Sequence, residues 1–583
     1  MKEKWFVWFS ALVRQIMSTA GYALRLRFEQ QTRRARNVRQ RTLKRILRKN
    51  QNTEFGRSHH FAEILAGESL ADRYRDAVPL SHYGDYEAAI QRMQAGETNI
   101  LAPGPMVGLI FTSGTTGPAK LIPKMPHQQR FGMIYGMLSG ILASSPALKT
   151  RGMLGKGISL MGYVRPRQPS TQEIPMSTAT GGGMQSMSAM IPYLWCSPPE
   201  VFSLEDMAAA RYLHALYGLR DRNAQYILAV FASYVLQWLM TLEQRWDELV
   251  RDIEQGTLTE NLNLPPDVRA SLAARLSPDP ARAAELRQIA AGGFVGIAPR
   301  IWPHMTRIGT VITGSFAVNV PAIRAYVGDI PFCGAMYAAS EGTIGISLQP
   351  NSDEYILAPD SAYFEFLPIA EADKEQPQTV LPDALTIGES YEVVMTTYNG
   401  FYRYRMGDIV QIAGYYHESP KLIFVRRKSV ELDLIGEKST EVHLNTAVSR
   451  MAETWLAGSD LRLRDYTFAL DIAQNPGRYV LYFELTGSHV PVTPPKPLDE
   501  AVHELDRNLC DANPALDRHR RNARMSAPQI KWLKPGSFDL LHEALFAHNP
   551  GGNYNQVKIP RHLKDTQLVE LLDGQVLETS NVT

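Results

Sequence analysis

Residues 111–120 read FTSGTTGPAK and are followed directly by LIPK. The apolar run Met106–Phe111 predicts a strand that leads into a loop of small, hydroxylated and glycine residues. Backbone N–H groups in such a loop can approach a polyphosphate closely, and its hydroxyls and Lys120 add further donors. A P-loop needs a second glycine and a Lys–Ser/Thr pair, but Ala119, Lys120 and Leu121 occupy those positions. The stretch therefore indicates a phosphate-binding loop of another kind, with a plain glycine turn as the alternative.

A second candidate is the stretch YAASEGTIG at residues 337–345, which follows a strand-like segment. Small residues there permit close approach to a flat base, on which Tyr337 can stack. The carboxylate of Glu341 suits Mg²⁺, a cation that prefers oxygen ligands. A capped turn formed by Ser340 and Glu341 would give the same pattern, so the stretch alone leaves both interpretations open.

A third candidate is YRYRMGDIVQIAG at residues 402–414. We interpret it as a strand–turn–strand that presents Asp408, because the vicinal hydroxyls of a ribose need a fixed carboxylate acceptor. Arg427, in the following FVRRKS stretch, can add a donor. The alternative is a β-hairpin with a solvated Asp408.

The pattern of apolar residues predicts two large domains preceded by a short extension. Residues 1–50 form a basic helical extension, residues 51–427 an α/β domain in which strands alternate with helices, and residues 428–583 a smaller α+β domain. A helix-rich block interrupts the α/β domain near residues 204–292. Within it, the uncharged run Tyr226–Leu242 is predicted to be a buried core helix, because charged residues continue its helical pattern directly and it is short for a membrane span.

Composition excludes several classes of protein. The chain has 583 residues with 44% apolar and 21% charged side chains, as in soluble globular proteins. Its three cysteines, Cys196, Cys333 and Cys510, lie far apart, which favours free thiols in a reducing compartment such as the cytoplasm. The sequence shows neither a disulfide framework nor a zinc-ligand spacing.

Positive charge is concentrated at the N-terminus. Residues 1–50 hold 14 of the 61 Lys/Arg and 2 of the 59 Asp/Glu, which leaves 47 basic and 57 acidic side chains in the rest of the chain. A surface that binds nucleic acid generally is therefore not expected. The spacing of Trp5, Phe9, Leu12 and Ile16 predicts an amphipathic helix. Docking of this helix on the protein, peripheral attachment to a membrane surface and nucleic-acid binding by residues 1–50 are the three interpretations, in that order of preference.

The three motifs, taken together and in this order, resemble those of the adenylate-forming superfamily. The chain is more closely similar to the auxin-responsive acyl acid amido synthetases, the plant enzymes that join jasmonate or indole-acetate to amino acids, and their bacterial relatives. The similarity extends from about residue 40 to about residue 565. It includes the stretches IWPHMTRIGTVITGSFAVNVPAIRAY (301–326), AYFEFLP (362–368), GRYVLYFEL (477–485), PGSFD (535–539) and NQVKIPR (555–561).

This resemblance implies a fold and a set of binding residues. The large N-terminal domain would be luciferase-like, with a β-barrel and sheets flanked by helices, and the small α+β domain would be mobile. The residues that would contact ATP or AMP are Thr112, Ser113, Gly114, Thr115, Thr116, Tyr337, Ser340, Glu341, Gly342, Asp408, Arg427 and Lys558. Lys120, Glu341 and Lys558 would be catalytic, with Glu341 also holding Mg²⁺.

The implied reaction uses ATP to convert a carboxylic acid into an acyl-adenylate, and an amine, normally an amino acid, then takes the acyl group. One alternative is a thioester ligase whose acceptor is coenzyme A or a carrier protein. Another is a non-catalytic nucleotide-binding protein or a membrane-recruited scaffold. Between the first two motifs the similarity is weak: TATGGGMQSMSAM (178–190) departs from the plant pattern, and residues 131–150 contain Lys149 but no arginine to pair with an acid. Plant hormones therefore need not be the substrates.

Overall fold

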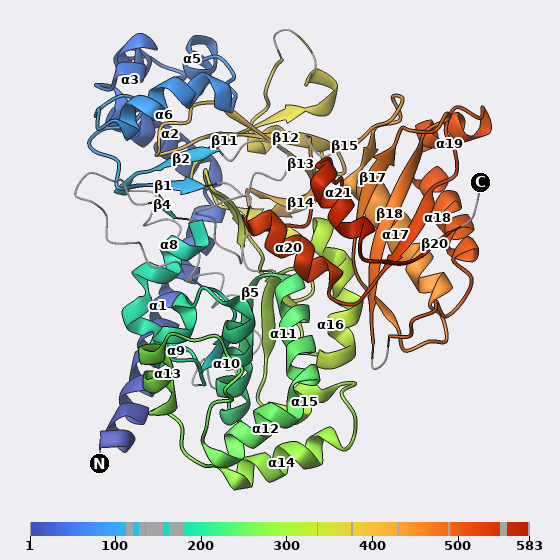
Figure 1. The fold of residues 1–583 in the computed structure, drawn as a ribbon. Coiled ribbons are helices and arrows are strands. Elements are labelled where there is room, and N and C mark those ends of the chain that lie inside the picture. The colour runs from blue at the N-terminus through green and yellow to red at the C-terminus, as the bar shows by residue number, and fades with distance from the viewer. Residues whose placement is uncertain are drawn as a thin grey trace. The chain divides into compact units, whose positions relative to one another are not determined.

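The computed structural model describes residues 2–111, 120–126, 135, 155–162, 176–177, 179–334, 336–372, 374, 377–428, 431–487, 490–547 and 557–580. These residues divide into two compact units. The second unit consists of Ile312–Tyr326 together with the chain from Val425 onward, and the first holds the other described residues. Figure 1 draws the start of the chain in blue and most of the second unit in orange and red.

The first unit begins with helices. They are α1 (Lys2–Thr32), α2 (Ala35–Asn50), α3 (Glu54–Ser58), α4 (Phe61–Ala66), α5 (Leu70–Ala77) and α6 (Glu87–Gln94). In α2 the buried residues Leu43, Ile46 and Leu47 recur at helical spacing. They share one core with the strands that follow, so these helices cover the sheets that carry the candidate site.

The described residues of the first unit also form three sheets. A three-stranded sheet has the order β2 (Leu121–Lys124), β1 (Gly108–Phe111), β4 (Met176–Ser177). A parallel sheet has the order β3 (Gly157–Ser159), β5 (Tyr226–Phe231), β6 (Arg307–Val311), β7 (Phe332–Cys333). A seven-stranded sheet has the order β11 (Tyr363–Pro368), β12 (Ser390–Thr396), β13 (Tyr404–Tyr416), β14 (Ser419–Arg427), β10 (Glu354–Leu357), β9 (Gly342–Ile346), β8 (Met336–Ala339).

Helices surround the parallel sheet. They are α8 (Ala179–Ser186), α9 (Ile191–Leu194), α10 (Met207–Arg220), α11 (Ala232–Gln244), α12 (Trp246–Gln255), α13 (Pro266–Ala273), α14 (Pro280–Ala290) and α15 (Ile297–Ile301). The prediction of one helix over Tyr226–Leu242 is wrong in its first part, because Tyr226–Phe231 forms β5 and the helix begins at Ala232. β5 lies between two parallel neighbours, and strands buried on both faces read as continuous apolar runs without alternation.

The second unit is an α+β sandwich built on a sheet with the order β17 (Arg462–Asp471), β18 (Arg478–Thr486), β19 (Gln529–Leu533), β20 (Val576–Thr579). Its helices are α16 (Val320–Val327), α17 (Glu441–Trp455), α18 (Leu498–Ala512), α19 (Pro514–Arg521), α20 (Ser537–Ala547) and α21 (Thr566–Asp573), and a short pair joins β15 (Glu431–Leu432) to β16 (Ser439–Thr440). Along β18, Leu481 and Phe483 enter the core with α17 and α18, whereas Val480 and Tyr482 enter the core with α20 and α21. This alternation is the period-2 pattern of a strand covered on both faces.

Among the described helices, none combines the length and the apolar character that a membrane span requires. α1 has 31 residues, but its polar and charged side chains are distributed along its whole length. The three cysteines, Cys196, Cys333 and Cys510, are free thiols.

Candidate active site

Lys120 is positioned by the β1–β2 hairpin. Phe111 pairs with Leu121 in this hairpin, so the residue before β2 returns to the end of β1. Tyr83 Oη accepts a hydrogen bond from the Leu121 N–H at 2.8 Å, which fixes the start of β2. The Lys120 ammonium lies 5.4 Å from the centroid of the Tyr83 ring. Five residues that are predicted to contact ATP or AMP lie outside the described residues: Thr112, Ser113, Gly114, Thr115 and Thr116.

Glu341 lies at the tip of a tight hairpin. Ala339 of β8 pairs with Gly342 of β9, so Ser340 and Glu341 alone form the connection. A turn residue is normally solvated, but Glu341 is buried, and the amide of Asn399 donates to its backbone carbonyl at 3.3 Å. A Cβ atom added at Gly342 would lie 3.1 Å from Met395 Cε, so the hairpin packs closely on β12.

Asp408 lies in a bulge of β13. Glu392 of β12 pairs with Ile409 and Val394 pairs with Arg405, so β13 has two more residues than β12 between these points. Gly407 has φ +78°, a conformation that glycine adopts without strain. Bulges of this kind redirect a side chain next to active sites. The prediction of a strand–turn–strand is wrong, because β13 is one continuous strand. The alternative of a hairpin with a solvated Asp408 is wrong too, because this residue is buried (2% exposed).

Tyr337 and Asp408 are brought together, as the prediction of a shared nucleotide site requires. The Tyr337 hydroxyl donates to Asp408 Oδ2 at 2.9 Å. Its ring lies 5.5 Å from the Tyr355 ring and 5.9 Å from the Phe424 ring. Tyr337 is half-buried, so these aromatic contacts set the orientation of a ring that still has an accessible surface.

Tyr404 joins two of the candidate residues, although no motif pointed to it. Its hydroxyl donates to Glu341 Oε1 at 3.2 Å and accepts from Lys120 Nζ at 3.3 Å, so one phenol joins the predicted phosphate lysine to the predicted metal carboxylate. The sequence contained a signal for it, because Tyr404, Met406 and Asp408 occupy alternate positions and would lie on one face of a strand. In the structure all three are buried. The two contact pairs, Tyr337–Asp408 and Tyr404–Glu341, both connect the β8–β9 hairpin to β13.

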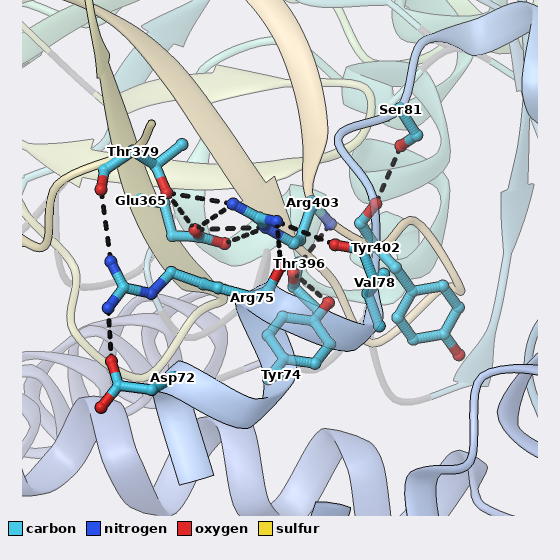
Figure 2. A network of polar contacts seen from close by, with 10 residues as sticks. All are labelled: Asp72, Tyr74, Arg75, Val78, Ser81, Glu365, Thr379, Thr396, Tyr402 and Arg403. Atoms are coloured by element: carbon cyan, nitrogen blue, oxygen red, sulfur yellow. Dashed lines mark hydrogen bonds and ion pairs between the residues drawn. The ribbon is translucent and has the colours of Figure 1, made fainter. Parts of the chain in front are cut away.

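A buried ion pair fixes the beginning of β13. Arg403 has φ +46°, unusual for a residue with a side chain. Its guanidinium bonds the Glu365 carboxylate at 3.0–3.2 Å and also donates to the carbonyls of Arg75 (2.7 Å) and Val78 (2.8 Å). Figure 2 shows these contacts converging between α5 and the sheet. The surrounding structure thus holds an unfavourable backbone conformation immediately before Tyr404.

The same network also includes Thr379 and Thr396, which Figure 2 shows beside the ion pair. Thr379 Oγ1 donates to Glu365 at 2.6 Å, and the Arg403 N–H donates to Thr396 Oγ1 at 3.0 Å. Thr396 in turn bonds the hydroxyl of Tyr74 at 2.8 Å. Every charged atom of the buried pair therefore has polar partners, the condition under which such a pair is tolerated in a core.

Burial and nearby charge keep the phenol of Tyr83 protonated. Burial is the main cause that raises the pKa of Tyr83, and the carboxylates of Glu87 and Glu341 add to it. Tyr83 therefore keeps a phenolic hydrogen beside Lys120 at neutral pH and presents a neutral ring to the ammonium.

Lys558 belongs to the second unit, on a segment that is fastened to β17. The Phe468 N–H donates to the Arg561 carbonyl at 3.0 Å, and the Leu563 N–H donates to the Phe468 carbonyl at 2.7 Å. The buried guanidinium of Arg561 donates to Asp465 Oδ1 at 2.6 Å. Lys558 itself is half-buried, with its ammonium 5.4 Å from the centroid of the Phe316 ring.

Arg427 is the last residue of β14, and its side chain is exposed. Ser340 is half-buried in the hairpin beside Glu341. Their proposed contacts with a nucleotide rest on the motif match alone.

A large α/β unit followed by a smaller α+β unit is the architecture of an adenylate-forming ligase. Comparisons with known proteins lead to the same class of enzyme. The GH3 family N-terminal, central and C-terminal domains match residues 25–332, 355–427 and 442–567. The chain belongs to the GH3 family, and it is an amido synthetase, a ligase that forms carbon–nitrogen bonds.

The similarity covers almost the whole chain. Indole-3-acetic acid-amido synthetase GH3.5 of Arabidopsis thaliana is 30% identical over 94% of this chain and 92% of its own length. The solved structure of the AtGH3.15 acyl acid amido synthetase in complex with 2,4-DB is 26% identical, with a TM-score of 0.84 over 97% of both chains. A solved 2-hydroxyisobutyryl-CoA ligase, 11% identical with a TM-score of 0.53, covers 93% of this chain and 91% of its own, and shares the fold alone.

Proposed function

We propose that this chain uses ATP and Mg²⁺ to adenylate a small carboxylic acid and then transfers the acyl group to an amino acid or a related amine. The observation that supports this most strongly is the convergence of Lys120 and Glu341 on Tyr404. A cation and a carboxylate that are distant in sequence meet there, on the strand that also carries Asp408.

In the first half-reaction a carboxylate oxygen of the acid attacks the α-phosphorus of ATP, and the bond to the β-phosphate oxygen breaks to release pyrophosphate. Negative charge increases on the phosphate oxygens, so the protein must supply positive charge and N–H donors. Lys120 and the loop residues Thr112–Thr116 would serve the phosphates. Asp408 would accept from the ribose hydroxyls, and Tyr337 would meet the adenine.

Glu341 fits the predicted role of magnesium ligand. Among the described residues no group of three or more His, Cys, Asp or Glu side chains could hold a metal ion by itself. One carboxylate suffices for Mg²⁺ because this ion takes its remaining ligands from substrate phosphates and water. When bound there, Mg²⁺ would neutralise charge on the phosphate oxygens. The Tyr404 hydroxyl would orient the carboxylate.

In the second half-reaction the nitrogen of the amine attacks the acyl carbon, and the bond to the AMP oxygen breaks. The amine loses a proton in this step, and AMP leaves as a stable anion. Lys558 would contact the phosphate during adenylate formation and is not required for the attack by the amine. Its anchored segment supports a defined position for this side chain.

The relatives indicate which kinds of acid and acceptor to expect. One relative is named for indole-3-acetic acid, and the solved relative holds 2,4-DB, so the family accommodates differing acids. We propose a small organic acid as donor and an amino acid as acceptor, in a cytoplasmic setting. A peripheral membrane contact through residues 1–50 is a separate proposal that depends on the exposed face of α1.

The choice of acceptor can be tested by competition. Purified protein with ATP, Mg²⁺ and an acid panel would receive an equimolar mixture of amino acids and coenzyme A, with products identified by mass spectrometry. We expect N-acyl amino acids and stoichiometric AMP. Acyl-coenzyme A as the main product would contradict the amide assignment while leaving adenylation intact.

A further inference from the structure

α1 leaves four of its apolar side chains exposed. Leu12, Ile16, Tyr22 and Leu26 have exposed fractions of 38%, 60%, 56% and 49%. Leu12 and Ile16 are one turn apart, as are Tyr22 and Leu26, and Leu26 lies about four turns beyond Leu12. These four residues, here called the apolar stripe, therefore occupy one side of the helix.

The opposite side of α1 is the docked side. Its buried residues are Ser10, Arg14, Gly21, Phe28 and Thr32, which follow a helical period of their own. The Arg14 guanidinium donates to the Tyr193 carbonyl at 2.8 Å. The docked side of this helix thus combines polar contacts with apolar ones, because Phe28 is buried in a hydrophobic cluster and Met17 and Leu24 pack against such clusters.

Further polar contacts fix the rotation of α1 about its axis. Arg27 and Gln31 donate to the buried Asp360 carboxylate at 2.7 and 2.5 Å. The Tyr416 hydroxyl donates to Glu29 at 2.6 Å. Turning the apolar stripe inward would break all of these contacts, so its exposure is built into the fold.

Charge indicates which kind of partner covers the stripe. Residues 1–50 carry a net charge of +12, with 14 basic and 2 acidic side chains. Arg41, Lys44 and Arg48 are exposed on α2. A second copy docked on the same helix would bring two such basic segments together, whereas an anionic lipid surface complements them.

Most of the stripe also precedes the part of the chain that matches the family. The match to the GH3 N-terminal domain begins at residue 25, so Leu12, Ile16 and Tyr22 all precede it. The first turns of α1 contain Trp5 and Trp8, residue types that favour the membrane interface. We infer that α1 lies flat on an anionic lipid surface, with the apolar stripe at the headgroup–acyl boundary and the exposed basic side chains of Arg41, Lys44 and Arg48 facing the headgroups.

Co-sedimentation of the full-length protein with vesicles tests this inference. One set of vesicles would be phosphatidylcholine mixed with phosphatidylserine, the other phosphatidylcholine alone. The double variant Leu12→Ser/Ile16→Ser removes half of the stripe, and Ile387→Ser is the matched control because Ile387 is 62% exposed and lies elsewhere in the first unit. We expect the partition coefficient onto phosphatidylserine vesicles to fall about tenfold or more in the double variant, and to stay unchanged in the control.

The inference would be overturned if the unaltered protein did not bind phosphatidylserine vesicles, or if the double variant bound them as well as the unaltered protein does. It would also be overturned if the protein bound vesicles of phosphatidylcholine alone equally strongly, or if two copies associated through the stripe. Analytical ultracentrifugation of the protein and the double variant detects the last. Neither variant touches the candidate active site, so ATP–pyrophosphate exchange and the unfolding midpoint verify that each is folded. Failure of vesicle binding with exchange intact would leave the proposed catalytic function standing.

Discussion

At the scale of single residues, Tyr404 shows how one hydroxyl can organise a charged site. Its hydroxyl accepts from Lys120 and donates to Glu341. When ATP binds, the ammonium and the carboxylate would turn to phosphate and metal. The phenol would remain as the fixed point that holds both within reach.

Tyr404→Phe tests this role. Removing the hydroxyl leaves the ring packed but frees both charged groups, and we expect kcat/KM for adenylate formation to fall about tenfold, because hydrogen bonds to charged groups contribute about 1.5–3 kcal/mol. Tyr402→Phe is the matched control two residues away. It loses the buried hydrogen bond from Tyr402 to the Leu101 carbonyl (2.6 Å) and should lower stability by about 1 kcal/mol without altering exchange. An equal loss of activity in both variants would refute a special role for Tyr404.

Asp408→Asn tests the assignment of the ribose site. The amide keeps the shape of the side chain but donates where the carboxylate accepts, so we expect ATP-dependent exchange to fall about 100-fold or more. Circular dichroism and the unfolding midpoint would verify the fold. Tyr337→Phe removes the hydrogen bond to Asp408 but keeps the aromatic ring that would meet the adenine. It should therefore lower exchange less than Asp408→Asn does. Unaltered exchange in Asp408→Asn would show that the carboxylate does not bind the ribose.

At the scale of elements, the Arg403–Glu365 pair determines where β13 begins. Arg403→Ala leaves the Glu365 carboxylate buried without its cation, and we expect a loss of about 3–5 kcal/mol in the free energy of unfolding, measured by urea titration. Glu365→Gln should destabilise the protein less, so its unfolding can be measured even if Arg403→Ala does not fold. Arg92→Ala is the control, because Arg92 also bonds two carboxylates, of Glu54 and Glu97, but on the exposed surface. Similar effects at both arginines would contradict the positioning role of the buried pair.

α10 contains a histidine that makes stability depend on pH. His214 is buried, its Nδ1 lies 2.8 Å from Ser197 Oγ, and burial lowers its pKa from the ordinary 6.5 to about 3. The unfolded chain takes up a proton below pH 6.5 and the folded protein does not. The stabilising contribution is therefore present above pH 6.5 and is lost as the pH falls toward 3.

Between pH 7 and pH 5 this residue should remove about 2 kcal/mol of stability, which His214→Gln would not lose. Urea unfolding of both proteins at the two pH values isolates the difference. An identical change in the two proteins would show that His214 is not kept neutral in the folded state.

Much of the fold could be predicted from sequence, because most elements obey simple periods. The apolar run Met106–Phe111 predicted a strand, and Gly108–Phe111 forms β1. Tyr226–Phe231 could not be assigned by period, since a strand buried on both faces has the same unbroken apolar run as a core helix. Glu341 and Asp408 were found from residue type, but the bulge at Gly407 and the bridge through Tyr404 depend on pairing between distant strands. The outward face of α1 also escaped prediction, because the contacts that fix it come from Asp360, Tyr416 and His417.

At the scale of the whole molecule, we propose that the two half-reactions need different residues. Lys558 lies on a segment of the second unit that Arg561 fastens to β17. We expect Lys558→Ala to lower adenylate formation about 100-fold while the reaction of a supplied acyl-adenylate with amine changes little, because only the first step builds charge on transferring phosphates. Lys564→Ala, an exposed lysine on the same segment, should leave both unchanged. Parallel losses in the two half-reactions would contradict a phosphate role for Lys558.

The most direct test of the central proposal is acid-dependent ATP–pyrophosphate exchange across aryl, indolic and fatty acids, with Asp408→Asn as the inactive control. We expect exchange with at least one class of acid, dependent on Mg²⁺ and lost in the control. Formation of amide without any acid-dependent exchange, or exchange that survives in Asp408→Asn, would contradict adenylation at this site.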